Sequence, residues 1–229
     1  MAEPLDPGRR RQIVSDGIAV SVATGAYGVS FGAIGVGNGL DIWQTCAMSL
    51  LVFTGASQFA LVGVLGAGGA PLLGAASGLL LGVRNTLYGL RLAPLLGWRG
   101  LRRAAAAHLV IDESTAMSVT RESSEAARVG FLTTGVGVFV LWNLSTLIGA
   151  VAGDALGDPR DYGLDAAVGA AFLALLWPRL DSTVHRLVAL CAAAVATGLV
   201  PFTAAGVPVL AAAVVALATA ALRRDREAP

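Results

Sequence analysis

The apolar stretches of this chain are the feature that most constrains its fold, because they are long and nearly free of charge. A helix needs about 20 mostly apolar residues to cross the hydrocarbon core of a bilayer. Candidate stretches lie at 17–37, 43–66, 71–97, 128–153, 163–179, 186–200 and 204–222. Only 14% of the residues are charged, against about 25% in soluble domains. We therefore predict an all-α, polytopic transmembrane helical bundle of about six to eight membrane segments, some of them short or broken.

The positions of the arginines predict how the chain is divided and oriented. We expect a cytoplasmic tail at 1–16, one transmembrane domain at 17–222 and a second cytoplasmic tail at 223–229. Arginines cluster before the first apolar stretch and after the last one. Cytoplasmic loops carry the excess of basic residues in membrane proteins, so both termini are expected on the cytoplasmic side. No basic patch with interleaved aromatic residues is present, and no nucleic-acid partner is expected.

The segment 104–120 leaves the number of crossings open. It begins apolar and then carries Asp112 and Glu113. If it crosses the bilayer after three full spans, the arginines at 99–103 lie outside, against the positive-inside rule. If two spans and a re-entrant piece precede Arg121 instead, the number of crossings before this arginine is also even. The sequence alone does not decide between the two arrangements.

A faint internal repeat is also visible. The glycine-bounded motif 28–32 is followed by Gly-Leu-Asp at 39–41 and an apolar run, and the motif 149–153 is followed by Gly-Leu-Asp at 163–165 and another apolar run. Transporters are often built from such repeats. A chance match explains so few residues equally well.

Polar residues interrupt the apolar segment 43–66 near its middle, where Gly55, Ser57 and Gln58 lie close together. An amide in hydrocarbon needs hydrogen-bond partners, because an unpaired one costs several kcal/mol. Two interpretations follow. Gln58 makes a structural hydrogen bond between helices, or the helix is locally unwound and lines a polar cavity with backbone groups free for a ligand.

Segment 71–97 carries Arg84 about halfway along an apolar run, together with Asn85 and Tyr88. A charge at that depth costs at least about 2.5–3.5 kcal/mol, so it needs a carboxylate, a cluster of carbonyl groups or an anionic ligand. A structural ion pair is one interpretation, and we favour a functional role. Asp112 and Glu113 are candidates for the counter-ion or for a proton carrier, although they could also form an exposed helix connector.

Three further polar or amphipathic residues are secondary candidates. Trp142 and Asn143 lie in the middle of segment 128–153, and Asp165 begins segment 163–179, where it could simply cap a helix. No nucleophile and base pair, phosphate-binding loop or Cys/His metal cluster can be drawn from the sequence. We therefore expect no enzymatic activity, no metal and no cofactor.

Several ordered motifs resemble the AzlC family, the large subunits of branched-chain amino acid permeases. The resemblance covers about residues 17–222, and it rests on the strings 49–59 and 83–94, on Tyr27–Gly32, on Asp112–Ser114, on Trp142 with Gly149, and on Gly163–Phe172. The chain departs from the family at Val83-Arg84-Asn85, where Asn-Arg-His is usual, and at Ala26, where proline is usual. Arg84 itself is retained.

The resemblance implies a transporter in the bacterial inner membrane that exports branched-chain or other hydrophobic amino acids. It also implies a drive from the proton-motive force and a small membrane partner subunit of the AzlD type. On this basis the substrate-binding residues are predicted to be Gly55, Ser57, Gln58, Arg84, Asn85 and Tyr88, with Asp112 and Glu113 as proton carriers or counter-ions. The alternative is a scaffold or assembly subunit that transports nothing, whose polar residues only tie helices together.

Overall fold

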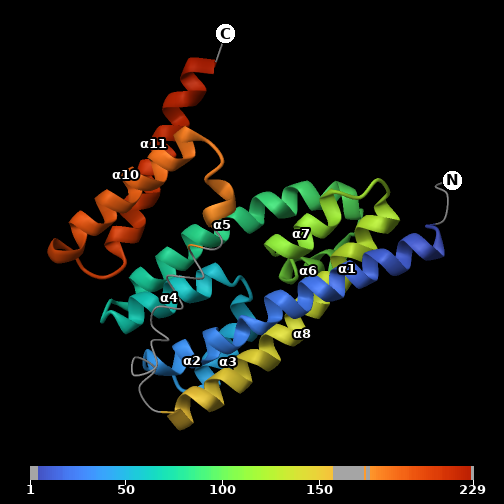
Figure 1. Cartoon of the computed structure of the whole chain (residues 1–229), viewed down its shortest axis with the longest axis horizontal. Helices are drawn as coiled ribbons and strands as arrows, with labels where there is room; N and C mark the ends of the chain where they lie inside the picture. The colour runs from blue at the N-terminus through green and yellow to red at the C-terminus, as the bar shows by residue number, and fades with distance from the viewer. Residues whose placement is uncertain (1–4, 157–172, 174–175, 228–229) are drawn as a thin grey trace.

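The computed structural model describes residues 5–156, 173 and 176–227. In this part of the chain the structure is helical and contains no strand, which confirms the predicted all-α bundle (Figure 1). Three helical stretches among the described residues are long and apolar enough to cross a membrane, namely Pro7–Gly37, Ser124–Ala155 and Thr183–Phe202.

The helices are named in chain order as in Figure 1. They are α1 (Pro7–Ala26), α2 (Gly28–Gly37), α3 (Ile42–Val52), α4 (Ala56–Gly66), α5 (Pro71–Leu96), α6 (Gly100–His108), α7 (Asp112–Val119), α8 (Ser124–Leu156), α10 (Thr183–Leu199) and α11 (Val207–Glu227). Short 3-10 turns occupy Trp177–Arg179 and Val200–Phe202. Because α1 starts at Pro7, part of the predicted N-terminal tail is helical.

Two long rods, α1 continued by α2 and α8, lie side by side and run in the same direction (Figure 1). At the N-terminal end, the Arg9 guanidinium lies 2.9 Å from the Glu122 carboxylate, just before α8 begins. Towards the other end, Gly32 of α2 faces Ala150 of α8, and Gly149 faces Val29. The two glycine motifs of the faint repeat therefore pack against each other, as small residues do between membrane helices.

We expect Gly32→Ala to destabilise the protein. A Cβ at this position would collide with the Thr146 carbonyl oxygen of α8, and relief requires α2 to separate from α8. Overpacking typically costs about 1–3 kcal/mol. The measurement is the melting temperature of the purified protein in detergent. Gly63→Ala is the control, since a Cβ there has nothing within 4 Å. Equal melting temperatures for the two variants would contradict the tight α2–α8 contact.

The segment 43–66 does not form one span, as its length and hydropathy suggested, but a re-entrant hairpin of α3 and α4. Each helix has 11 residues, or about 16 Å at 1.5 Å per residue, which is half of a bilayer core. Helix α3 enters beside the end of α2, where Thr45 lies against Gly35, and α4 returns to the same end, where Gly66 lies against Asn38.

A second hairpin, made by α6 and α7, enters from the opposite end. It begins after α5, whose Leu96 carbonyl oxygen accepts a hydrogen bond of 2.8 Å from Nε of Arg128 in α8. It ends at Arg121, whose guanidinium lies 3.7 Å from the Asp16 carboxylate of α1. The segment 104–120 therefore does not cross the bundle, in agreement with the re-entrant alternative.

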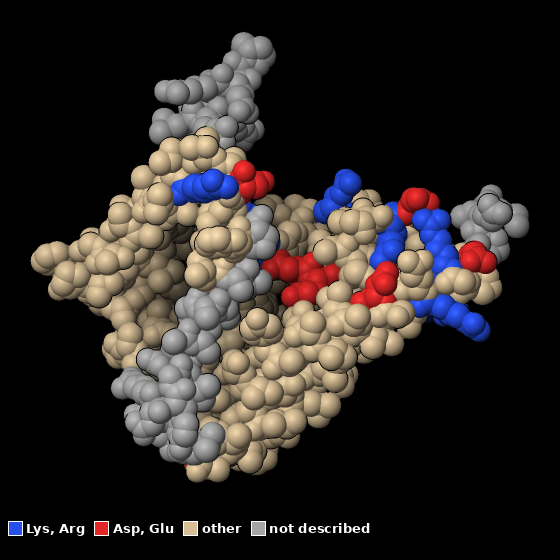
Figure 2. Space-filling view, viewed as in Figure 1, with Lys and Arg blue, Asp and Glu red and all other residues tan. Residues whose placement is uncertain are grey.

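Helix α5 connects the two ends and runs antiparallel to α1 and α8. Its first half packs on α4, and its last residues reach the arginine-rich end of the bundle. The arginines at 9–11, at 99–103, at 121 and at 128 consequently share one end, and basic side chains gather there in Figure 2. This distribution is what the positive-inside rule requires of a single membrane face.

Helices α10 and α11 form an antiparallel pair that projects from the rest of the bundle, where α11 touches α5 (Figure 1). The predicted segment 186–200 was short for a crossing. In the structure the helix starts at Thr183 and continues through the 3-10 turn to Phe202, which gives 20 residues. None of the residues of α10 is buried, so its apolar side chains are free to face lipid.

Candidate functional site

The first part of the site is the break between α3 and α4. Phe53 has a φ of 30° and is the only non-glycine residue with a positive φ among those described. Gly55 follows with φ 54° and ψ −86°, a conformation that glycine adopts because it lacks a Cβ. The Gly55 N–H donates a 3.1 Å hydrogen bond to Oε1 of Gln58. The structure thus agrees with a locally unwound helix at this position.

The turn between α6 and α7 repeats this arrangement from the other end. The Ile111 N–H donates a 3.1 Å hydrogen bond to Oγ of Ser114 three residues later, just as Gly55 does to Gln58. The two hairpin tips touch: Nε2 of His108 lies 2.9 Å from the Leu50 carbonyl oxygen, and the rings of Phe53 and His108 are 5.9 Å apart. Helices α4 and α7 therefore both begin deep inside the bundle.

A cavity of about 260 Å³ lies where the hairpin tips meet. Residues of α1, α4, α5, α7 and α8 and of the two hairpin turns form its wall. The lining residues are Ala23, Thr24, Tyr27, Phe53, Thr54, Gly55, Ala56, Phe59, Arg84, Asn85, Ile111, Asp112, Glu113, Val138 and Trp142.

An ion pair forms the charged side of this cavity. The Arg84 guanidinium lies 2.9 Å from Oδ2 of Asp112, and their side chains are 30% and 23% exposed. Glu113 lines the same side, so neither acidic residue belongs to an exposed connector. Because both carboxylates stand in the first turn of α7, the helix dipole stabilises their negative charge. The arginine predicted to need a counter-ion has Asp112 as its partner.

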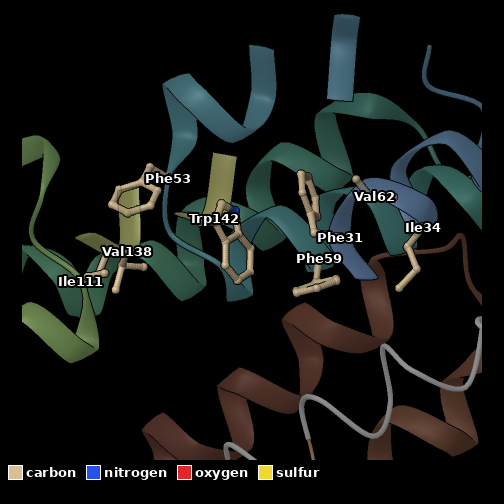
Figure 3. Close-up of a cluster of buried hydrophobic side chains, with 8 residues drawn as sticks. All are labelled: Phe31, Ile34, Phe53, Phe59, Val62, Ile111, Val138 and Trp142. Atoms are coloured by element: carbon tan, nitrogen blue, oxygen red, sulfur yellow. The ribbon is translucent and has the colours of Figure 1, made fainter. Parts of the chain in front are cut away.

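Apolar and aromatic side chains form much of the remaining wall and the packing behind it. Figure 3 shows Trp142 between Phe53, Val138 and Ile111 on one side and Phe31 and Phe59 on the other. The Trp142 ring is stacked on Phe31 with centroids 6.2 Å apart, and it meets Phe59 edge-on at 6.3 Å. Such a wall suits an aliphatic or aromatic side chain of a ligand.

Several buried polar atoms around the cavity have no hydrogen-bond partner among the described residues. Among the lining residues they are Oγ1 of Thr54, Oδ1 of Asn85, Oδ1 of Asp112 and Nε1 of Trp142, and Nε2 of Gln58 is a fifth in the first turn of α4. Buried polar groups in native proteins are nearly always paired. Five of the ten such atoms among the described residues lie at or beside this cavity, where a polar ligand or water has room to pair with them.

Of the residues predicted from the sequence, six line the cavity together: Gly55, Arg84, Asn85, Asp112, Glu113 and Trp142. Ser57 and Gln58 do not; both are buried behind the wall, and Ser57 faces Gly78 and Gly82 of α5. The Tyr88 ring packs against a second apolar cluster around Leu92 and Phe131, while its hydroxyl interacts with the Asp112 carboxylate behind the cavity wall. Nδ2 of Asn143 donates to the Phe139 carbonyl oxygen of its own helix. Asp165 lies outside the described residues.

Sequence reasoning missed the rest of the wall, notably Thr24, Thr54 and Val138. Thr54 carried a signal, because it stands directly before Gly55 in the interrupted segment. Thr24 carried none, since a threonine in an apolar helix is commonplace and often bonds to its own backbone. Only the packing of α1 against α8 brings it to the cavity.

The chain was compared with known proteins. A family model described as AzlC protein matches residues 19–156, more than half of the chain. Neither a search of curated proteins nor a search of solved structures finds a significant match. The matched range contains every lining residue of the cavity and ends before α10 and α11.

Proposed function

The chain belongs to the AzlC family of membrane proteins, which are linked to branched-chain amino acid transport, and on that premise we propose that it exports branched-chain or other hydrophobic amino acids. The export is driven by the proton-motive force and uses a small AzlD-like membrane subunit. The chain is the large, substrate-binding subunit in the bacterial inner membrane, with both termini in the cytoplasm.

The observation that carries this proposal is the cavity between the two hairpin tips. Its position, between two half-length helices that enter from opposite ends, suits a substrate that must be reached from each side in turn. Its wall combines an ion pair with apolar rings. A zwitterion with an aliphatic side chain has the matching chemistry.

Arg84 and the two acidic residues each have two alternative roles in a transport cycle. Arg84 binds the substrate carboxylate, or it holds Asp112 until the substrate arrives. Asp112 or Glu113 binds the ammonium group or carries a proton across. Both acidic residues face the cavity beside Arg84, so protonation of either one changes the net charge that a substrate meets there.

The rival interpretation, a scaffold that transports nothing, predicts that the polar residues pack dry against other helices. Gln58 fits that description, because it is fully buried and bonds to its own chain through Gly55. Arg84 does not, because it lines a cavity. The balance of these observations favours a transporter.

An efflux assay tests the proposal. Cells that lack their own exporters are loaded with dipeptides of leucine, isoleucine, valine or methionine, and the release of the free amino acid is followed with and without this chain and with and without the neighbouring small subunit. We expect faster efflux of at least one of these amino acids when both chains are present. If none of the four is released faster in any combination, the proposal is wrong.

A further inference from the structure

The two helix starts at the cavity differ in charge. The first turn of α7 contains Asp112 and Glu113, so its dipole is already balanced by two carboxylates. The first turn of α4 contains no acidic residue, and no side chain of its N-cap residue bonds to it. The free N–H groups of α4 therefore remain an uncompensated positive end, aimed at the Thr54–Ala56 side of the cavity.

The unpaired polar atoms divide in the same way. Of the lining residues next to α4, Trp142 has an unpaired pure donor, Nε1, and Thr54 has an unpaired hydroxyl that can donate; the Gln58 amide N–H is also unpaired but lies behind the wall. A Cβ added to Gly55 would lie 4.0 Å from Cη2 of Trp142, which places the indole against the break. Trp142 is 5% exposed and lines the cavity, and its unpaired N–H is a second donor, independent of the helix end, for a ligand that lies beside this ring.

The unpaired acceptors belong to the other side. They are Oδ1 of Asn85 on α5 and Oδ1 of Asp112 on α7, and the carboxylate of Glu113 lines the cavity next to them. Arg84 is already paired through Oδ2 of Asp112, and although the Tyr88 hydroxyl also interacts with this carboxylate, Oδ1 makes no hydrogen bond to the described residues. A cationic group with several N–H donors would satisfy these acceptors at once.

We propose that the cavity orients its ligand as a zwitterion, with the carboxylate at the start of α4, bonded to the Trp142 N–H, and the ammonium group at Asn85 and Asp112. This inference rests on the proposed function and narrows it. The ligand class is a free α-amino acid that carries both charges, and Arg84 stays with Asp112 instead of binding the carboxylate. Trp142 is then a specificity-determining residue that recognises the acidic end of the ligand.

Binding of three matched probes tests this orientation. Leucine carries both charges, leucinamide lacks the carboxylate and 4-methylpentanoate lacks the ammonium group. Their dissociation constants are measured on the purified full-length protein in lipid nanodiscs, for the native chain and for Trp142→Phe and Asn85→Ala. Trp142→Phe keeps an aromatic ring in place and removes only the indole N–H.

We expect the native chain to bind leucine at least about tenfold more tightly than either analogue, because a hydrogen bond to a charged group is worth that much or more. Trp142→Phe should weaken leucine and 4-methylpentanoate about tenfold and leave leucinamide unchanged. Asn85→Ala should weaken leucine and leucinamide and leave 4-methylpentanoate unchanged. The comparison of the three probes on the native chain stands even if a variant fails to fold.

Two results would overturn the orientation while leaving the transporter proposal intact. One is native binding of leucine that is no tighter than binding of leucinamide. The other is a Trp142→Phe variant that binds leucine normally, or that weakens leucinamide as much as leucine. A native chain that binds no leucine at all would overturn both the orientation and a leucine-exporting function.

Discussion

Export by the Arg84→Ala variant should fall to the background of cells that lack the protein, while the variant still reaches the membrane. The substitution leaves the Asp112 carboxylate without its 2.9 Å partner. Breaking a buried ion pair costs about 3–5 kcal/mol, and less here because both side chains are partly exposed. The ligand would then meet two uncompensated carboxylates, Asp112 and Glu113, in the cavity wall. Efflux and membrane level are measured on the same cells.

The double variant Arg84→Ala with Asp112→Ala separates structure from function. If the pair only holds α5 to α7, removal of both charges restores stability and export together, as is often seen when a buried ion pair is replaced. If the pair serves transport, the double variant regains stability but not export, and that is the expected result. Arg91→Ala is the matched control, because this arginine lies on the same helix and is exposed. Normal efflux by Arg84→Ala would show that the site is assigned wrongly.

The pairing of Arg84 is the part of the site that the sequence could predict. A charge in the middle of an apolar run has few ways to persist, and the chain offers only two carboxylates together in a nearby apolar segment, at 112 and 113. The cost of an unpaired charge in hydrocarbon is large enough to outweigh most local preferences. The need of a buried charge for a partner is therefore strong enough to be deduced from the sequence.

The hairpin of α3 and α4 could not be predicted in the same way. A segment of 24 apolar residues satisfies the length and hydropathy of a full span, and a re-entrant hairpin of two half helices has the same composition. What distinguishes them is the backbone at Phe53 and Gly55 and the return of Gly66 to Asn38. These are tertiary features, and the glycine in the sequence only permits them.

Tyr88 and Asn143 show how differently two polar residues in spans are accommodated. Tyr88 shares a helical face with Arg84 by spacing, and although its ring packs on the second apolar cluster, its hydroxyl still interacts with Asp112. Asn143 satisfies part of its amide within its own helix, at 2.7 Å from the Phe139 carbonyl oxygen. Spacing along a helix gives a face, but which neighbour packs on that face depends on the whole fold.

The second large expected effect concerns the backbone at Gly55. We expect Gly55→Ala to lose export while the protein keeps its fold. The position has φ 54° and ψ −86°, which a residue with a Cβ adopts only at a cost of about 1–3 kcal/mol. The added methyl group itself has room, since its nearest neighbour is Cη2 of Trp142 at 4.0 Å. Strain is therefore relieved by a local change at the start of α4, without separating helices.

Such a local change rotates the free N–H groups of α4 away from the cavity and breaks the 3.1 Å bond between Gly55 and Gln58. We expect efflux to fall at least about tenfold and the melting temperature to drop by about 2–12 °C, as about 1–3 kcal/mol implies for a chain of this size. Gly89→Ala is the control, because this glycine lies within a helix and a Cβ there meets nothing within 4 Å. If Gly55→Ala exports as fast as Gly89→Ala, the break serves only to connect two helices. A selective loss of export in Gly55→Ala means that the geometry of the break is itself part of the binding site.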